Sequence, residues 1–292
     1  MLNIFLHRSG KIRLVWRLPL FAILLLILIS PLLLLSNSIL QFLLGALLLT
    51  GLLFFWSRIV DHEPLQYYGL DASASMVAEL MTGLIIGFLA VAAMFLLVAS
   101  PAATDTWLPD SEALNRAFGL FFLKAVLVAY WEETMFRGFL MVNLRDDISP
   151  RWGNRKGTAA AVMASSLLFG AIHSGTDHFS WLAFAVLTLN GIIWCVPMIM
   201  TGRLGLSIGL HASWNFAQSK IFGFAMSGNA SHQSLLEAKP VGGDIWTGGA
   251  YGPEGGLVGI AGLLLMFTLI LAYCYWARKL DRQSSERHPD FH

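Results

Sequence analysis

Long apolar runs dominate this chain of 292 residues and constrain its fold more than any other feature. A bilayer core needs about 20 apolar residues per helix. Only helices satisfy the backbone in lipid without closing a barrel, and the runs lack the two-residue alternation of barrel strands. The sequence therefore predicts an all-α polytopic membrane protein, a bundle of about eight transmembrane helices forming a single domain over residues 1–292. The expected helices cover residues 15–35, 38–57, 76–99, 117–142, 157–174, 180–200, 205–226 and 256–277.

The composition supports this class and gives no sign of a nucleic-acid partner. Hydrophobic residues make up 56% of the chain and charged residues 13%, with a net charge of +1; a soluble domain carries about a quarter charged residues. Cys195 and Cys274 lie in apolar runs without metal-binding spacing, so we expect two buried small side chains. The first run lacks a small-residue cleavage site after it, which predicts a retained helix rather than a signal peptide.

Lysine and arginine residues in the connections predict the orientation of the chain. In a chain of eight spans, the three basic clusters fall on one side, together with Arg58 and Arg203. Both termini, including the short basic tail 278–292, are therefore predicted to be cytoplasmic. The clusters are Arg8, Lys11, Arg13 and Arg17; Arg145, Arg151, Arg155 and Lys156; and Arg278, Lys279, Arg282 and Arg287.

Two connections are longer than simple turns. Residues 58–73 carry three acidic side chains, and we expect them to pack as a short interfacial segment. Residues 227–255 end in "GGDIWTGGAYGPEGG", where the glycine density predicts an ordered, tightly turning loop. A flexible spacer is the alternative, although Trp246, Tyr251 and Pro253 are unusual in a spacer.

Ionisable residues inside apolar spans are candidate functional residues because each is costly there unless it is paired or hydrated. Glu133 and Arg137 are four residues apart, so they share a helix face, which predicts an ion pair. Glu132 lies about 100° around the helix from Glu133 and about 140° from Arg137. A local salt bridge therefore explains Glu133 and Arg137 but leaves Glu132 directed elsewhere.

Three further polar residues lie on other expected spans. His173 ends the fifth span, with Phe169 one turn earlier as a support for its ring. His211 and Asn215 are four residues apart and share a face of the seventh span. Taken alone, His173 fits a hydrogen-bonded packing residue, and the second pair fits polar contacts between helices.

Taken together, these residues suit hydrolysis. Glu132 is suited to act as general base on a water molecule, and His173 to hold that water or carry a proton. His211 and Asn215 can donate hydrogen bonds to the oxyanion formed at a peptide carbonyl. No serine or cysteine is placed as an evident nucleophile, which favours an activated water.

Three ordered segments resemble the signature of a known family. "EETMFR" at 132–137, "FGAIH" at 169–173 and "HASWN" at 211–215 resemble the motifs EExxxR, FxxxH and HxxxN of the CAAX-type prenyl protease and bacteriocin-processing family of intramembrane glutamic endopeptidases. The resemblance covers about residues 130–216. It implies a membrane protease whose cavity opens towards the cytosol, and one that works without metal or cofactor. The implied roles are catalytic glutamate for Glu132, its partner for His173, oxyanion donors for His211 and Asn215, and support for Glu133, Arg137 and Phe169.

The resemblance also bears on partners and location. The implied substrate is a membrane-associated protein or peptide, lipid-modified or not. The segment "GGAYGPEGG" looks like a feature of some bacterial members, which favours a bacterial inner membrane.

Three other functions remain open at this point. A metal-dependent hydrolase would use the same residue types, although there is no HExxH pattern and Asn215 is a poor zinc ligand. A transporter or channel would also bury charges, but no inverted repeat is visible. A non-catalytic scaffold or bacteriocin-immunity protein would not need Glu132.

One expectation fits the protease poorly. His173 lies about 16 residues into its span and His211 about six, which predicts depths that differ by roughly 15 Å. A steep tilt, or an interfacial start of the fifth helix around residues 152–158, would reconcile them.

Overall fold

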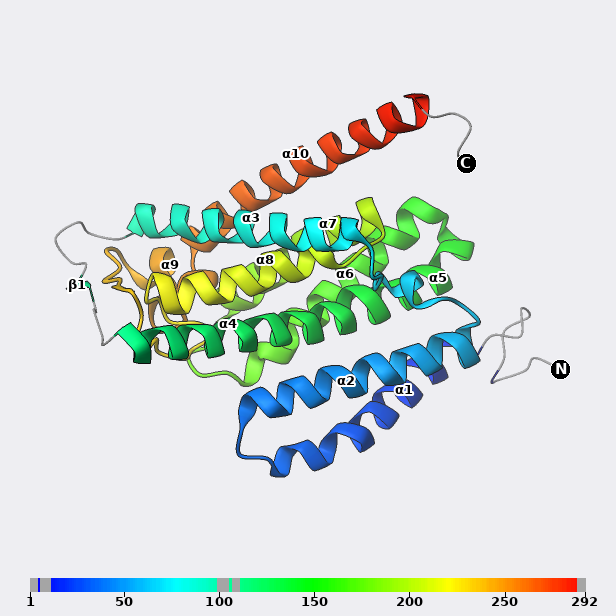
Figure 1. Cartoon of the computed structure of the whole chain (residues 1–292), viewed down its shortest axis with the longest axis horizontal. Coiled ribbons are helices and arrows are strands. Elements are labelled where there is room, and N and C mark those ends of the chain that lie inside the picture. The colour runs from blue at the N-terminus through cyan, green and yellow to red at the C-terminus, as the bar shows by residue number, and fades with distance from the viewer. Residues whose placement is uncertain (1–4, 6–11, 99–104, 107–110, 288–292) are drawn as a thin grey trace.

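The computed structural model describes residues 5, 12–98, 105–106 and 111–287. The molecule is a bundle of helices that run roughly along one long axis (Figure 1). Within the described residues, six helical segments are long and apolar enough to cross a membrane. These are Leu14–Leu34, Ser38–Asp61, Ala74–Val98, Asn154–Gly175, Trp181–Thr201 and Leu257–Lys279. The predicted all-α membrane architecture is therefore confirmed, whereas the count of eight spans stays a prediction.

The first half of the chain contains α1 (Leu14–Ile29), α2 (Ser38–Trp56), α3 (Ala74–Val98), α4 (Ser111–Glu133) and α5 (Met141–Trp152). The second half contains α6 (Asn154–Ile172), α7 (Trp181–Thr201), α8 (Gly205–Phe216), the short α9 (Asp244–Thr247) and α10 (Leu257–Arg287). Two-residue strands β1 (Asp105–Thr106) and β2 (Leu236–Glu237) pair antiparallel. Shorter 3₁₀ and π segments are η1 (Ser30–Leu34), η2 (Ser57–Asp61), η3 (Leu65–Tyr68), η5 (Thr134–Leu140), η6 (His173–Gly175), η7 (Ala217–Ile221), η8 (Gly249–Tyr251) and η9 (Pro253–Gly255).

Two expected spans differ from the simple picture. The helix predicted over 117–142 is longer, because α4, η5 and α5 follow one another without a break from residue 111 to 152. The helix predicted over 205–226 ends earlier, since α8 and η7 stop at Ile221. Neither α4 nor α8 is among the six apolar segments. Both carry the polar residues from which the candidate site is built.

The start of α1 and the end of α10 lie at the same end of the bundle (Figure 1). An even number of crossings would bring both termini to one side of a membrane. Their cytoplasmic location stays a prediction, and Arg8, Lys11 and residues 288–292 lie outside the described residues.

The connection between α2 and α3 packs through buried polar side chains. Arg17 of α1 lies 3.3 Å from the Asp61 carboxylate and donates to the Asn143 side-chain oxygen at 2.7 Å. The Tyr68 hydroxyl donates to Asp61 at 2.5 Å. Burial, reinforced by the Asp61 charge, raises the pKa of Tyr68, so the phenol stays a neutral donor. These contacts tie α1, η2, η3 and α5 together at one end of the bundle.

Helices α3 and α8 approach closely through glycines spaced four residues apart. On α3, a Cβ at Gly83 would lie 2.8 Å from the Leu210 nitrogen, and one at Gly87 would lie 2.5 Å from the Leu210 carbonyl oxygen. On α8, a Cβ at Gly209 would lie 2.9 Å from the Leu84 nitrogen. Small residues at this spacing let helix backbones pack directly against each other in a membrane. The contact sets the position of the helix that carries His211.

A Gly209→Ala substitution tests this contact. Alanine normally favours a helix over glycine by about 1 kcal/mol, but here its methyl group would collide with the α3 backbone. We expect a lower thermal unfolding midpoint in detergent. Gly51→Ala in α2 is the control, because no atom lies within 4 Å of its Cβ position, and it should leave the midpoint equal or higher. Equal stabilisation by both substitutions would contradict the close α3–α8 contact.

Candidate active site

The predicted ion pair between Glu133 and Arg137 is present at the junction of α4 and η5. The Arg137 Nη1 atom donates to Glu133 Oε1 at 3.0 Å, and the exposed fractions of the two side chains are 1% and 0%. The π-helical segment η5 begins directly after Glu133. Such segments inside α-helices are frequent at functional sites. The pair is therefore a desolvated charge pair in the middle of the bundle.

The Arg137 guanidinium also contacts two aromatic rings from other helices. Its central carbon lies 4.3 Å from the Phe169 ring centre and 5.6 Å from that of Trp194. A cation over an aromatic face is attracted by the electron density of the ring, more strongly when both are desolvated. Arg137 thus joins η5 to α6 and α7. The sequence did not identify Trp194 as a site residue, because a tryptophan within an apolar run matches no motif or spacing.

His211 contacts both adjacent glutamates through opposite ring nitrogens. Its Nδ1 atom lies 2.9 Å from Glu133 Oε1, within hydrogen-bond distance, and its Nε2 atom lies 3.9 Å from Glu132 Oε2. The indole of Trp194 lies against the imidazole, with ring centres 4.3 Å apart. Because the two carboxylates lie about 100° apart around α4, they approach different nitrogens of the His211 ring. The sequence placed the glutamates on different faces but did not link Glu133 to His211.

The two histidines meet at Phe169. The Phe169 ring centre lies 4.9 Å from that of His173 and 6.4 Å from that of His211. The expected mismatch in depth between the histidines is therefore wrong. That expectation counted residues from the start of each helix. The count gives relative depth only if α6 and α8 start at the same height and run parallel.

The hydrogen bond of His173 indicates which of its ring nitrogens is available to accept a further hydrogen bond. Its Nδ1 atom lies 2.8 Å from the Phe169 carbonyl oxygen. A carbonyl oxygen only accepts, so Nδ1 carries a hydrogen, and in the neutral ring Nε2 is left as an acceptor. The ring is half-buried. An acceptor nitrogen in this position can take a hydrogen bond from a water molecule.

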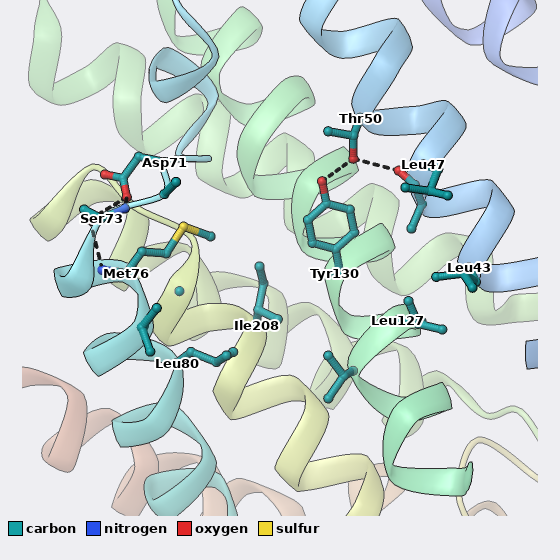
Figure 2. A pocket seen from close by; sticks show the side chains of 15 residues that line it. Leu43, Leu47, Thr50, Asp71, Ser73, Met76, Leu80, Leu127, Tyr130 and Ile208 are labelled. Carbon is teal, nitrogen blue, oxygen red and sulfur yellow. Dashed lines mark hydrogen bonds between the residues drawn. The ribbon is translucent and has the colours of Figure 1, made fainter.

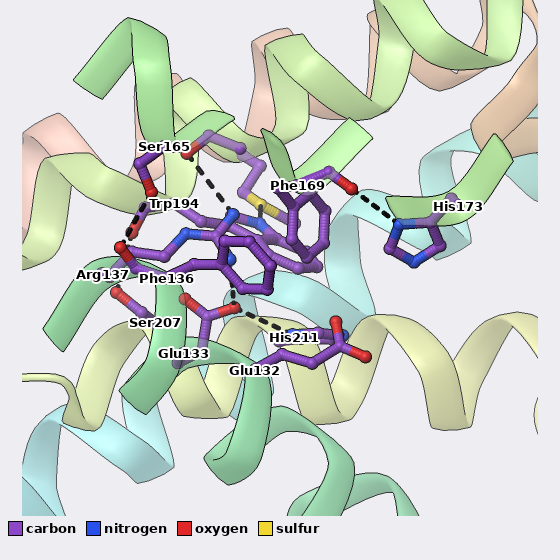
Figure 3. A network of polar contacts seen from close by, with 12 residues as sticks. Glu132, Glu133, Phe136, Arg137, Ser165, Phe169, His173, Trp194, Ser207 and His211 are labelled. Atoms are coloured by element: carbon purple, nitrogen blue, oxygen red, sulfur yellow. Dashed lines mark hydrogen bonds and ion pairs between the residues drawn. The ribbon is translucent and has the colours of Figure 1, made fainter. Parts of the chain in front are cut away.

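Glu132 is the accessible member of the glutamate pair, with 21% of its side chain exposed. Figure 3 shows its carboxylate on the side of the His211 ring where His173 lies, while the buried Glu133 and Arg137 lie on the other side. Asn215, one turn after His211, is half-buried, and its carboxamide makes no hydrogen bond with the described residues. The site therefore has a buried charged layer and a more open layer that contains Glu132, His173 and Asn215.

An apolar cavity of about 490 Å³ is lined by residues that include chain neighbours of Glu132 and His173. It lies between α1, η5 and α6, and its lining includes Trp131 and Ile172, the neighbours of Glu132 and His173. A larger cavity of about 580 Å³ lies between α2, α3, α4 and α8 (Figure 2). Its polar lining consists of hydroxyl groups and Asp71 without histidine. Of these two cavities, only the smaller one is lined by chain neighbours of Glu132 and His173.

Two observations concern possible metal ligands and thiols. Within residues 12–98, 105–106 and 111–287, no group of three or more histidine, cysteine or acidic residues is arranged to hold a metal ion. Cys195 and Cys274 are free and buried, as the sequence predicts.

Comparison with known proteins gives one match. Residues 114–217 match the family model described as type II CAAX prenyl endopeptidase Rce1-like. This range includes the residues that form the site described above. The comparisons found no matching curated protein and no matching solved structure.

A double-mutant cycle tests the buried pair. Arg137→Met leaves the Glu133 charge uncompensated and should cost about 3–5 kcal/mol of stability. Adding Glu133→Gln should restore part of the loss, with a coupling free energy of about 1–3 kcal/mol. The measurement is thermal or denaturant unfolding of the purified protein.

The matched control is Arg151 and Asp147, which are also four residues apart but lie 3.9 Å from each other with 64% and 24% of their side chains exposed. Arg151→Met and Asp147→Asn should change stability by less than about 1 kcal/mol each. Similar coupling in the two cycles would show that burial does not strengthen the Glu133–Arg137 pair.

Proposed function

Because residues 114–217 match the Rce1-like family model, we propose that the chain is a CAAX-type, glutamate-dependent endopeptidase. It is an integral multi-pass membrane protein, and the reaction is hydrolysis of a peptide bond in a membrane-associated protein or peptide. The observation that supports this mechanism most is the unequal placement of the adjacent glutamates. Glu133 is fully buried against Arg137, whereas Glu132 is partly exposed beside His211 and the Phe169–His173 turn.

In the proposed first step, Glu132 takes a proton from a water molecule as that water attacks the peptide carbonyl. His173 holds the same water through Nε2, the nitrogen left free by the hydrogen bond from Nδ1 to Phe169. The carbonyl oxygen becomes an oxyanion as the new C–O bond forms. Glu132 then returns the proton to the leaving amine when the C–N bond breaks.

In this mechanism, the oxyanion receives hydrogen bonds from Asn215 and His211. The Asn215 amide group has two donors available. His211 faces Glu132 with Nε2, because Nδ1 is engaged by Glu133. A hydrogen on Nε2 requires either an imidazolium ring or a proton on Glu133 that is donated to Nδ1. Glu133 therefore supports catalysis by setting the protonation of His211 as well as by pairing with Arg137.

The apolar cavity lined by Trp131, the residue before Glu132, supports the proposed substrate class. An apolar space of about 490 Å³ between α1, η5 and α6 suits a hydrophobic segment of a membrane-bound peptide or an attached lipid chain. Both kinds of substrate fit this chemistry, so the test must include both. We place the protein in a bacterial inner membrane on the resemblance of its "GGAYGPEGG" segment alone.

Substitution of Glu132 and His173 tests the mechanism. Glu132→Gln should lower cleavage by about 10²–10⁴-fold, the usual contribution of a general base, and His173→Ala should have an effect of similar size. The thermal midpoint should stay close to that of the wild type, because the Glu132 side chain is partly exposed and its charged contact, His211 Nε2, lies 3.9 Å away. The assay uses reconstituted protein with two fluorogenic peptides, one with a farnesylated CAAX terminus and one without the lipid.

Glu237→Gln is the control, since this carboxylate is exposed and lies in the loop outside the site. Comparing peptide C-termini from cells that carry wild-type or Glu132→Gln protein covers substrates unlike the two probes. Wild-type cleavage by Glu132→Gln would overturn the mechanism. Cleavage that stops on thorough chelation and returns with added zinc would favour a metal-dependent hydrolase instead.

Glu133→Gln should act differently from Glu132→Gln. Its neutral amide can donate to His211 Nδ1, which keeps the hydrogen of the neutral ring on Nε2 without any proton from residue 133, and this should alter the pH dependence of kcat/KM. It should also lower the thermal midpoint, because Arg137 loses its buried counter-charge. Equal catalytic loss in both variants, with unchanged stability and an unchanged pH profile, would contradict these unequal roles.

A further inference from the structure

The loop between η7 and α10 contains a buried carboxylate that the proposed reaction does not use. Glu254, in the segment "AYGPEGG", is 4% exposed. Its Oε1 atom accepts hydrogen bonds from the Ser227 backbone nitrogen at 2.6 Å and from the Ser227 hydroxyl at 2.8 Å. Its Oε2 atom accepts from the Trp214 indole nitrogen at 3.3 Å. These donors compensate for the loss of water around the carboxylate.

The Trp214 contact joins Glu254 to the face of α8 that carries His211 and Asn215. Residues three and four positions apart lie on one side of an α-helix, so His211, Trp214 and Asn215 share a side of α8. The Gln218 side chain donates to the Ala225 carbonyl oxygen at 2.7 Å. The loop is therefore fastened at Trp214 of α8 and at Gln218 of η7, the segment that directly follows α8.

The Ser227 contact joins Glu254 to the turn that follows His173. Ser227 has a φ of +47°, a conformation that serine rarely adopts, and its backbone nitrogen is the one bonded to Glu254. The next residue, Gly228, packs so closely on the Asp177 backbone that a Cβ would lie 2.7 Å from the Asp177 carbonyl carbon. Asp177 is four residues after His173. The Phe179 and Tyr251 rings, 6.3 Å apart, extend the same contact.

We propose that Glu254 is a positioning residue. It fixes the position of the Asn215 face of α8 relative to the turn after His173. This inference rests on the proposed function for its catalytic consequence. Trp214 and the Ser227 backbone can only donate, so both carboxylate oxygens must accept. A glutamine of the same shape would direct its amide nitrogen at one of these donors, and the link between α8 and the Ser227 turn would open.

The first measurement does not depend on activity. Hydrogen–deuterium exchange of Glu254→Gln protein in detergent should be faster than wild type by about tenfold or more in two segments. These are 226–229, which includes the Ser227 amide, and 173–179, which includes the Thr176 amide bonded to the His173 carbonyl oxygen at 3.0 Å. Glu237→Gln in the same loop is the matched control and should leave both segments unchanged. Wild-type exchange of 173–179 in Glu254→Gln protein would overturn the proposal.

The second measurement uses whichever of the two fluorogenic peptides the wild-type protein cleaves. Glu254→Gln should lower kcat by about ten- to a hundredfold, the scale expected for a displacement of about 1 Å in catalytic groups, with KM within about twofold. An unchanged kcat alongside faster exchange of 173–179 would overturn the positioning role. Absence of wild-type cleavage would count against the proposed protease function, while the exchange result would still decide whether Glu254 holds the two elements together.

Discussion

A single carboxylate oxygen, Glu133 Oε1, joins the elements on which the site depends. It accepts a hydrogen bond from Arg137 at 3.0 Å and lies within hydrogen-bond distance of His211 Nδ1, at 2.9 Å. An unpaired charge at this depth would cost several kcal/mol, so the surrounding helices must stay close enough to compensate it. Because Arg137 also lies against the Phe169 and Trp194 rings, one ionic contact links η5, α6, α7 and α8. The motif residues are far apart in the sequence and meet around this oxygen.

The buried pair also explains why two adjacent glutamates can have different roles. A general base must be reached by water, whereas a charge that orients a histidine works best where water is excluded. Neighbouring positions on one helix differ by about 100°, which is enough to place one carboxylate in each environment. Glu133 is fully buried, and Glu132 keeps 21% of its side chain exposed. One short sequence thus supplies two carboxylates with different surroundings on either side of the same imidazole.

Local features of this molecule could be predicted from the sequence, and contacts between distant segments could not. The Glu133–Arg137 pair follows from a spacing of four residues on one helix, and the apolar helices follow from run length. The Glu133–His211 hydrogen bond depends on how closely α4 and α8 approach, and the glycine contact of α8 with α3 helps to set that position. Spacing within one helix contains no information on this distance. Glu254 illustrates the same limit, since its partners Trp214 and Ser227 lie 40 and 27 positions away.

The helices of the site differ in how firmly the protein interior holds them. Helix α8 is fixed by the α3 backbone, by Glu133 and by the loop that contains Glu254. By contrast, only 17% of the most apolar stretch of α1 and 22% of that of α2 is buried, against 61% for α7. Figure 1 shows α1 and α2 side by side along one edge of the bundle. Since α1 also lines the cavity that contains Trp131 and Ile172 in its walls, one wall of this cavity is a helix with few internal contacts. This division suits the proposed hydrolysis within a membrane, in which the proposed catalytic groups need a fixed geometry and an apolar substrate needs access from the side.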